Sequence, residues 1–395
     1  MTGSDSAISI PKREPEQNSS MSSCDSIAQD LGFPDQDQEL WWRATAHSLG
    51  RLLADYRYSK DDQLLHLEWY HKYILPALGP YPVRDQKPQF QPCPVSDGSA
   101  CEHSINWREK GTRQTVRFTI EAVGPQAGTV ADPFNQEAGE RLLRRLAKDV
   151  PDVKLALFDH FAKDFFLPND AAESLIPKMP PGTPLSQIWI AFDLLRGRLM
   201  AKVYFMPILK WIHTGVPTKT LVFDTARKIN VAHGTFNASI ELLDSFLESS
   251  PTGENPVMEM VAVDCIDHAD SRIKFYLRTG VDTLAKAKHQ LTLGGRLSGE
   301  VTEEGLEALS ELWPILFRLE GDDIEDIAVL PAGSYCGCAV EMKPGRAEPE
   351  TKLHMPVRKV KGTDAQLCDS LSSWFQRRGH SEFAATYKDN LTATL

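Results

Sequence analysis

The sequence predicts an α+β fold in which pairs of helices alternate with pairs of strands, the strands forming an antiparallel β-barrel surrounded by the helices. Three observations support this prediction. Apolar residues recur at helical spacing in paired segments, apolar and polar residues alternate in the segments that follow, and this α-α-β-β order repeats along the chain. Four copies are complete, and a fifth helix pair has no strands after it. Hairpins joined in this way can form one sheet that curls into a barrel with the helices outside.

The elements follow one another in a regular order. The expected helices are residues 37–56, 59–78, 135–150, 153–166, 220–232, 237–250, 282–293, 302–320, 363–379 and 381–395. The expected strands are residues 100–107, 113–123, 186–195, 199–207, 257–267, 271–279, 334–343 and 351–359. The second helix, for example, ends at a Gly-Pro-Tyr-Pro segment, which cannot continue a helix.

Composition sets the domain boundaries. Residues 1–37 are rich in Ser, Asp, Glu, Pro and Gln and contain few large apolar residues, which predicts a disordered N-terminal tail. Residues 38–395 are expected to form a single barrel domain.

Charge and hydropathy exclude several classes of protein. The net charge of −11 argues against a nucleic-acid partner, because phosphate backbones bind to concentrated basic surfaces. The chain has no run of 18 apolar residues and no apolar signal segment, so neither membrane association nor secretion is expected. Seven scattered cysteines are typical of reduced thiols, which predicts a cytoplasmic location.

Cationic side chains share one face of several predicted strands. In the sixth strand, alternation places Arg272, Lys274 and Tyr276 on the face opposite the apolar residues between them. Other strands add Arg117, Lys202 with Tyr204, and Lys352 with His354. Cations gathered inside a barrel would repel one another unless a polyanion were bound, so a diphosphate is a good candidate ligand. The alternative, that this face is the solvated side of the strands, stays open at this point.

Two acidic features could carry chemistry. Glu102, in the first predicted strand, is a candidate general base, although a carboxylate at a strand start is more often simply solvated. Asp322, Asp323 and Asp326 match a D-D-x-x-D pattern that can hold magnesium bridged to a diphosphate. This pattern follows a predicted helix end and has no second acidic motif facing it, so we expect a solvated loop and no metal site.

Seven short segments together resemble the fungal indole prenyltransferases of the dimethylallyltryptophan synthase family. In order, they are LLHLEWYHKYILPALGPYP, CEHSINW, TVRFTIE, AFDLLRGRLMAKVYFMP, DSRIKFYL, LTLGGRL and KLHMPV. Each is weak alone, but jointly, in the family's order and spacing, they are specific. The resemblance runs from about residue 38 to the C-terminus and implies the α-α-β-β (ABBA) prenyltransferase barrel.

The resemblance also implies an activity. The family transfers a dimethylallyl group from dimethylallyl diphosphate to an indole ring, without a metal and with no other cofactor. By position, Glu102 is then the expected catalytic residue, accepting a hydrogen bond from the indole N–H. The expected diphosphate-binding residues are Arg117, Lys202, Tyr204, Arg272, Lys274, Tyr276 and Lys352. Aromatic faces would stabilise the allylic cation, and the barrel would exclude water from it.

The sequence departs from the family pattern at three places. His354 stands where a Tyr is usual, and Trp189 stands where relatives that act on free tryptophan tend to have a Lys; both are expected to contact substrate. Trp189 therefore favours a tryptophan-containing cyclic dipeptide as the acceptor, in indole alkaloid biosynthesis. Family members also continue into a fifth pair of strands. Eight strands would leave unpaired barrel edges, so we expect the sequence to be a C-terminally shortened form.

Other functions stay open on the sequence. The acceptor could be free tryptophan, or the shortened chain could bind diphosphate and indole without turnover. An interaction scaffold of helical repeats would instead leave the basic strand residues facing bulk solvent. The expected partners are dimethylallyl diphosphate and an indole-containing acceptor, and a homodimer is compatible with the sequence.

Overall fold

The chain divides into two compact units. The computed structural model describes residues 22–83, 87–95, 98–107, 114–180, 183–229, 234–249, 256–321, 323–331 and 334–394. Unit 1 comprises the chain up to Gly215, with Val263–His268 and Thr394; unit 2 comprises Val216–Ala262 and Ala269–Ala393. The sequence predicted one domain over residues 38–395, so this division is a finding of the structure.

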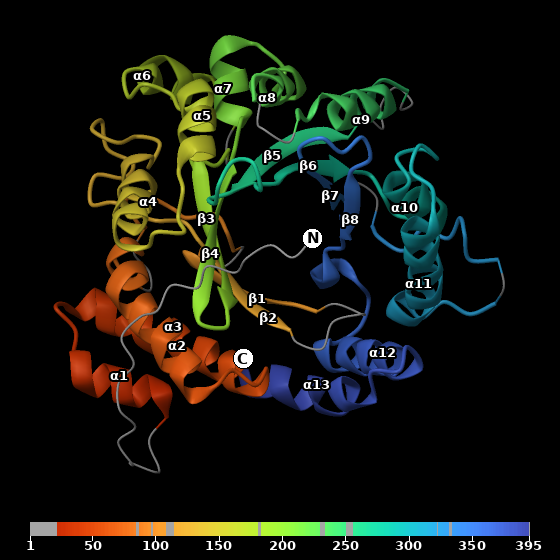
Figure 1. Ribbon diagram of the computed structural model, residues 1–395, viewed down its shortest axis with the longest axis horizontal. Helices are drawn as coiled ribbons and strands as arrows, with labels where there is room; N and C mark the ends of the chain where they lie inside the picture. The colour runs from red at the N-terminus through yellow and green to blue at the C-terminus, as the bar shows by residue number, and fades with distance from the viewer. Residues whose placement is uncertain are drawn as a thin grey trace. The chain divides into compact units, whose positions relative to one another are not determined.

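Among the described residues, groups of two or three α-helices alternate with pairs of strands along the chain, where the sequence predicted helix pairs throughout (Figure 1). The helices are α1 (Ser23–Leu31), α2 (Gln36–Asp55), α3 (Lys60–Trp69), α4 (Glu137–Asp149), α5 (Ala156–Phe165), α6 (Ala171–Leu175), α7 (Ile208–Thr214), α8 (Thr218–Arg227), α9 (Asn237–Ser249), α10 (Leu284–Leu291), α11 (Glu300–Phe317), α12 (Asp364–Arg377) and α13 (Ser381–Thr394). The strands are β1 (Cys101–Asn106), β2 (Thr115–Ile120), β3 (Ile188–Leu195), β4 (Arg198–Phe205), β5 (Val257–Asp264), β6 (Ile273–Thr279), β7 (Cys336–Met342) and β8 (Glu350–His354). None of the described helices combines the length and apolarity needed to cross a bilayer.

Within each unit, strands that are consecutive along the chain are hydrogen-bonded neighbours in the sheet. Within unit 1, β1 to β4 pair antiparallel, and within unit 2, β6 to β8 do the same. In unit 1, α4 packs on β3 and α5 on β4, as Figure 1 shows. The α+β class and the hairpin order predicted from the sequence are therefore confirmed.

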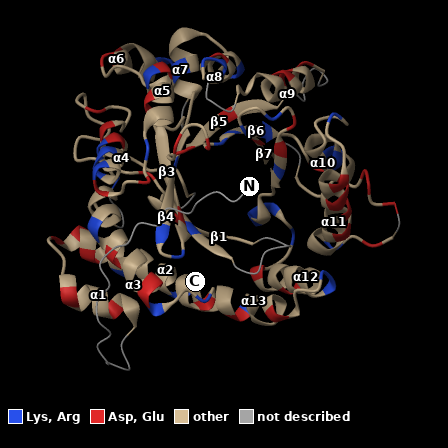
Figure 2. Cartoon of the chain, viewed as in Figure 1, with Lys and Arg blue, Asp and Glu red and all other residues tan. Residues whose placement is uncertain are grey.

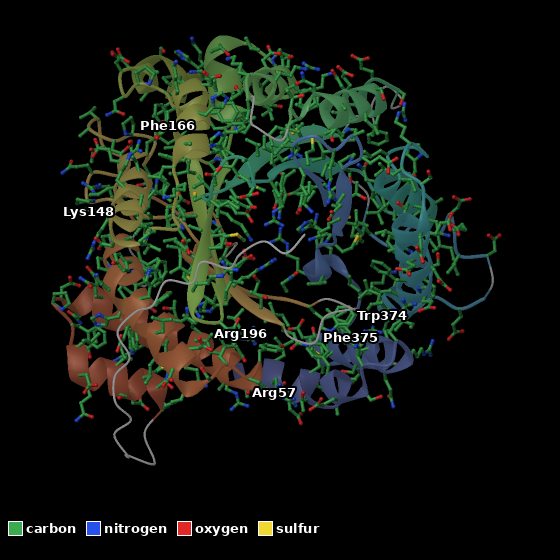
Figure 3. The ribbon with its side chains drawn as sticks, viewed as in Figure 1. Arg57, Lys148, Phe166, Arg196, Trp374 and Phe375 are labelled. Atoms are coloured by element: carbon green, nitrogen blue, oxygen red, sulfur yellow. The ribbon has the colours of Figure 1, made fainter. Side chains whose placement is uncertain are left out.

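Aromatic residues fill the space between sheet and helices in unit 1. The ring of Phe205 on β4 is fully buried, and the centroids of Phe158, Phe161 and Phe165 of α5 lie 5.8–5.9 Å from it. Phe166, labelled in Figure 3, adds another ring at 6.2 Å. Because side chains alternate along a strand, burial of this face leaves the opposite face to the polar residues.

The β3–β4 turn contacts the loop between α2 and α3 through Arg196. The guanidinium of Arg196, labelled in Figure 3, stacks on the ring of Tyr58 at 3.8 Å. It also donates hydrogen bonds to the backbone carbonyls of Gln114 at 2.8 Å and Tyr56 at 3.0 Å. These contacts fix the hairpin that carries the polar face of β3 and β4.

Unit 2 has its own apolar core. Phe275 on β6 is fully buried, and its ring lies 5.6 Å from that of Phe223 on α8. Trp374 and Phe375 mark α12 in Figure 3, and Phe375 packs against Phe383 of α13 at 4.7 Å.

A helix lies within the segment predicted to be a disordered tail. Ser22 caps α1 by accepting a hydrogen bond from the Asp25 backbone N–H. Cys24 and Ile27 of this helix are buried, and the Cys24 thiol donates to the Ala46 carbonyl at 3.1 Å. The predicted tail is therefore wrong for residues 23–31, because one apolar stripe suffices to dock a short helix. Residues 1–21 lie outside the described residues.

Acid is expected to destabilise the fold through His66. This residue of α3 is 1% exposed, with Nε2 2.8 Å from the Leu195 carbonyl oxygen. Burial lowers the pKa of His66 from 6.5 to about 4. The unfolded chain therefore takes up a proton before the folded chain does, and stability present above pH 6.5 falls as the pH drops towards 4. The loss is about 3 kcal/mol from this group, and thermal unfolding followed by circular dichroism across this window measures it.

The variant His66→Gln keeps a donor for the Leu195 carbonyl but cannot titrate, so its unfolding temperature should depend less on pH. His268→Gln, at a half-exposed position of unit 1, serves as the control and should follow the wild type. An unchanged pH dependence in His66→Gln would contradict the assignment.

Candidate active site

The polar face of the unit 1 sheet brings together residues from all four of its strands. The antiparallel register aligns two cross-strand rows on this face, Ser104–Arg117–Asp193–Met200 and Glu102–Thr119–Ala191–Lys202. A third pairing, Trp189 with Tyr204, lies next to the second row. Five residues singled out in the sequence, Glu102, Arg117, Trp189, Lys202 and Tyr204, therefore share one face, as alternation predicts.

Asp193 lies at the centre of the unit 1 cation cluster, which we define as Arg117, Asp193 and Lys202. The Lys202 ammonium donates to Asp193 Oδ2 at 2.6 Å. Arg117 approaches the same carboxylate with Nε 2.9 Å from Oδ1 and a guanidinium N–H donating to Oδ2 at 3.2 Å. Both Lys202 and Asp193 are only 4% exposed. Lys202 is thus not part of a solvated strand face.

Burial affects the charge of Lys202. Desolvation lowers its pKa from 10.5 to about 8, and the positive charge of Arg117 acts in the same direction. The carboxylates of Asp193 and Asp264 oppose this shift. The protonated form of Lys202 therefore depends on its acidic neighbours.

Glu102 lies on β1 in the same row as Lys202. Its side chain reaches solvent, yet the surrounding protein raises the pKa of its carboxyl by desolvation. A carboxyl with a raised pKa accepts protons more readily than an ordinary one, which is what a general base requires.

Trp189 packs against a buried carboxyl that sequence reasoning did not single out. Glu121, 1% exposed, accepts hydrogen bonds from the Cys93 backbone N–H at 2.9 Å and from the Asn135 amide at 3.4 Å. The indole N–H of Trp189 is buried beside Glu121 and Cys93 without a well-aligned partner. Burial raises the pKa of Glu121 to about 7. The Trp189 ring thus lies beside this network, at the edge of the polar face.

Unit 2 contains a second group of cations around a carboxylate. We define the unit 2 cation cluster as Arg272, Lys274, Lys352 and Glu341. Glu341 on β7 is 5% exposed; its carboxylate lies 3.1 Å from Arg272 and 2.9 Å from Lys274. Burial opposes its ionisation, but Lys274, Arg272 and Lys352 hold the pKa of Glu341 down at about 2. Figure 2 shows basic and acidic residues together along β6 and β7.

Tyr276 and His354 lie beside these cations. The register aligns Tyr276 with Ala339 and Ala339 with Lys352. The rings of Tyr276 and His354 meet edge to face, with their centroids 5.8 Å apart. Desolvation and the charges of Lys352 and Lys274 lower the pKa of His354, so it faces this cluster as a neutral ring near pH 7. Lys352 and His354 are more exposed than the other members of this group.

Sequence reasoning missed the two central carboxylates. Asp193 and Glu341 each stand two residues after an Ala on the polar face of a strand, opposite apolar residues, so alternation could have found them. As for metals, no cluster of His, Cys, Asp or Glu able to hold an ion occurs in the described part of the chain. Asp322 of the D-D-x-x-D pattern lies outside that part.

Comparison with known proteins places these features in a family. The sequence profile of the tryptophan dimethylallyltransferase family matches residues 37–390. The chain belongs to this family. The resemblance stated from the seven sequence segments is thereby confirmed, and the chain is a prenyltransferase.

Relatives of this prenyltransferase are similar over most of their length. Prenyltransferase iacE of Pestalotiopsis fici is 39% identical over 364 residues, covering 90% of this chain and 83% of the relative. The 7-dimethylallyltryptophan synthase hasE of Aspergillus fumigatus is 34% identical over 377 residues, covering 91% and 79%.

Solved structures agree with the fold. AnaPT from Neosartorya fischeri superposes with a TM-score of 0.84 at 29% identity, over 94% of this prenyltransferase and 89% of AnaPT. NotF in complex with brevianamide F and DMSPP superposes with a TM-score of 0.82 at 26% identity, over 95% and 90%. The fold is that of the α-α-β-β prenyltransferases, as predicted.

Proposed function

We propose that this prenyltransferase moves a dimethylallyl group from dimethylallyl diphosphate to the indole ring of a tryptophan-containing cyclic dipeptide. The observation that supports this most is the polar face of unit 1, where Glu102 shares a row with the buried cation Lys202. An acceptor for positive charge and a cation for a leaving anion on one surface suit this reaction.

The negatively charged diphosphate of the donor would be bound by cationic side chains. We propose Arg117, Lys202 and Tyr204 as the diphosphate-binding residues that unit 1 contributes. For unit 2 we propose Arg272, Lys274, Tyr276 and Lys352. Arg offers a planar fork and Lys a compact point charge, and both stabilise a departing diphosphate. His354, edge to face with Tyr276, is proposed to act as a neutral hydrogen-bonding neighbour.

The chemistry is an aromatic substitution. The C1–O bond of the donor breaks, and the diphosphate leaves with the electron pair. A ring carbon of the indole attacks the allylic cation, which forms the new C–C bond and places positive charge on the ring. The proton of that carbon then passes to the departed diphosphate, which restores aromaticity. Glu102 accepts a hydrogen bond from the indole N–H and thereby stabilises the charged ring.

Trp189 is relevant to which acceptor the enzyme prefers. Its ring, which lies beside Glu121, offers a flat apolar surface where a cyclic dipeptide can stack, whereas a Lys there would suit the carboxylate of free tryptophan. The NotF complex contains brevianamide F, a cyclic dipeptide, which favours the first acceptor. The name of the hasE relative, a 7-dimethylallyltryptophan synthase, favours free tryptophan as the second candidate.

Turnover with two acceptors tests the proposal. Incubation with dimethylallyl diphosphate and EDTA should give a prenylated cyclic Trp–Pro dipeptide, detected by mass spectrometry, at a higher kcat/KM than prenylated tryptophan. A strict requirement for magnesium would contradict the metal-free mechanism, and a preference for free tryptophan would favour the second candidate. Diphosphate binding without turnover on either acceptor would indicate the non-catalytic alternative.

A further inference from the structure

The two cation clusters are built on the same local plan. In each, the middle strand of three carries an Ala followed two residues later by a buried acid, Ala191 with Asp193 and Ala339 with Glu341. The register sets a Lys of the next strand opposite each Ala, Lys202 and Lys352. It sets a cation of the preceding strand opposite each acid, Arg117 and Lys274. Each unit thus shows, independently, an acid in contact with cations that we assign to the diphosphate.

The net stability that these two carboxylates contribute does not explain their position. A buried ion pair contributes little net stability, since desolvation of the two charges offsets most of their attraction. An acid at this position instead reduces the repulsion between the neighbouring cations when no anion is bound. It also restricts their rotamers, with contacts of 2.6 Å to Lys202 in unit 1 and 2.9 Å to Lys274 in unit 2.

We propose that Asp193 and Glu341 are positioning residues, internal counter-ions that keep the diphosphate-binding cations charged and oriented before the donor arrives. The proposal rests on the proposed function for the identity of the anion. Neither acid contacts the reacting atoms in this scheme; each acts through the cations that it holds.

Lys202 makes the proposal measurable. The charged groups that face it are Asp193 on β3, Asp264 at the end of β5 and Arg117 on β2. Replacing Asp193 by Asn removes an attraction and keeps the burial and the repulsion from Arg117, so Lys202 will lose its proton at a lower pH than in the wild type. Anion binding then weakens where the wild type still binds well.

Titration calorimetry with inorganic diphosphate, from pH 6 to pH 9, tests this without any acceptor. We expect the Kd of Asp193→Asn to lie within about threefold of the wild-type Kd at pH 6 and to exceed it at least tenfold at pH 8. Taking the ratio at each pH cancels the ionisation of diphosphate itself. Asp159→Asn, an exposed acid paired with Arg144, is the matched control and should give a ratio near one throughout.

A ratio that is raised equally at every pH would mean a purely structural role and overturn the proposal, as would no change at all. If Asp193→Asn does not fold by circular dichroism, Lys202→Arg replaces it. An always-charged guanidinium should improve binding relative to the wild type as the pH rises above 8; a flat ratio overturns the proposal.

Unit 2 is tested in the same way. Glu341→Gln should weaken diphosphate binding about tenfold, whereas Glu350→Gln, the neighbour of Glu341 on β8 that pairs with Lys343, should not. Equal effects of the two substitutions would overturn the role of Glu341. Because these measurements need no turnover, failure to prenylate an indole would refute the proposed function and leave this inference standing.

Discussion

We expect Glu102→Gln to lose most turnover and to leave donor binding intact. The substitution keeps the size of the side chain and removes the negative charge that we propose as the acceptor for the indole N–H and the counter-charge of the ring cation. Loss of a positioned general base costs roughly 10²- to 10⁴-fold in rate, so kcat should fall by that factor. The KM for dimethylallyl diphosphate should stay within about threefold of the wild-type value, because a lost transition-state interaction appears in kcat. Steady-state kinetics with a fixed, saturating acceptor measures both.

A matched control is available on the same unit. Glu140→Gln changes an exposed carboxylate of α4 that pairs with Arg144, and it should leave kcat unchanged. Glu102→Asp retains the charge on a shorter arm and should recover part of the lost rate. Near-wild-type kcat in Glu102→Gln would show that another group accepts the charge of the ring.

Phe205→Ala is expected to lower the free energy of unfolding by about 3–5 kcal/mol, the cost of emptying a large buried site. Phe205 is fully buried among the three α5 rings of the unit 1 core, and these rings cannot close the space without losing their own contacts. The same strand carries Lys202 and Tyr204 on its other face, so the loosened packing should also raise the KM for the donor. Denaturant titration followed by circular dichroism measures the first effect.

Val130→Ala provides the comparison, because that side chain is 95% exposed and should change stability by less than about 0.5 kcal/mol. If both variants unfolded at the wild-type denaturant concentration, the aromatic cluster would not be what holds β4 against α5.

The face of each strand could be predicted from the sequence, and the partners across strands could not. Side chains point alternately to the two faces of any strand, so spacing alone predicts that Lys274 and Tyr276 share a face. The register that brings Arg117 to Asp193 joins positions 76 residues apart, and Arg272 and Glu341 are 69 apart. Such pairing depends on how whole hairpins align, which no local pattern encodes.

The burial of individual side chains could not be predicted from the sequence either. Lys202 and Lys352 look alike in their segments, yet Lys202 is buried and Lys352 is exposed. The two lysines lie in segments of similar pattern, so their different exposure follows from the tertiary structure and not from the local sequence. Sequence reasoning also missed the helix α1. Its buried apolar stripe consists of only Cys24 and Ile27, which is too little to stand out in a segment rich in polar residues.

The plan shared by the two cation clusters has an evolutionary consequence. A unit that carries its own acid can be duplicated with part of the positive charge of the new copy already compensated. One copy is then free to diverge. At the position two residues before the Ala, unit 1 has Trp189 while unit 2 has Gly337, whose missing side chain gives room to His354, with a Cβ placed there lying 3.2 Å from the His354 Cβ. If Trp189 contacts the acceptor as proposed, this position can change in one copy while the acid beside the cations stays in place.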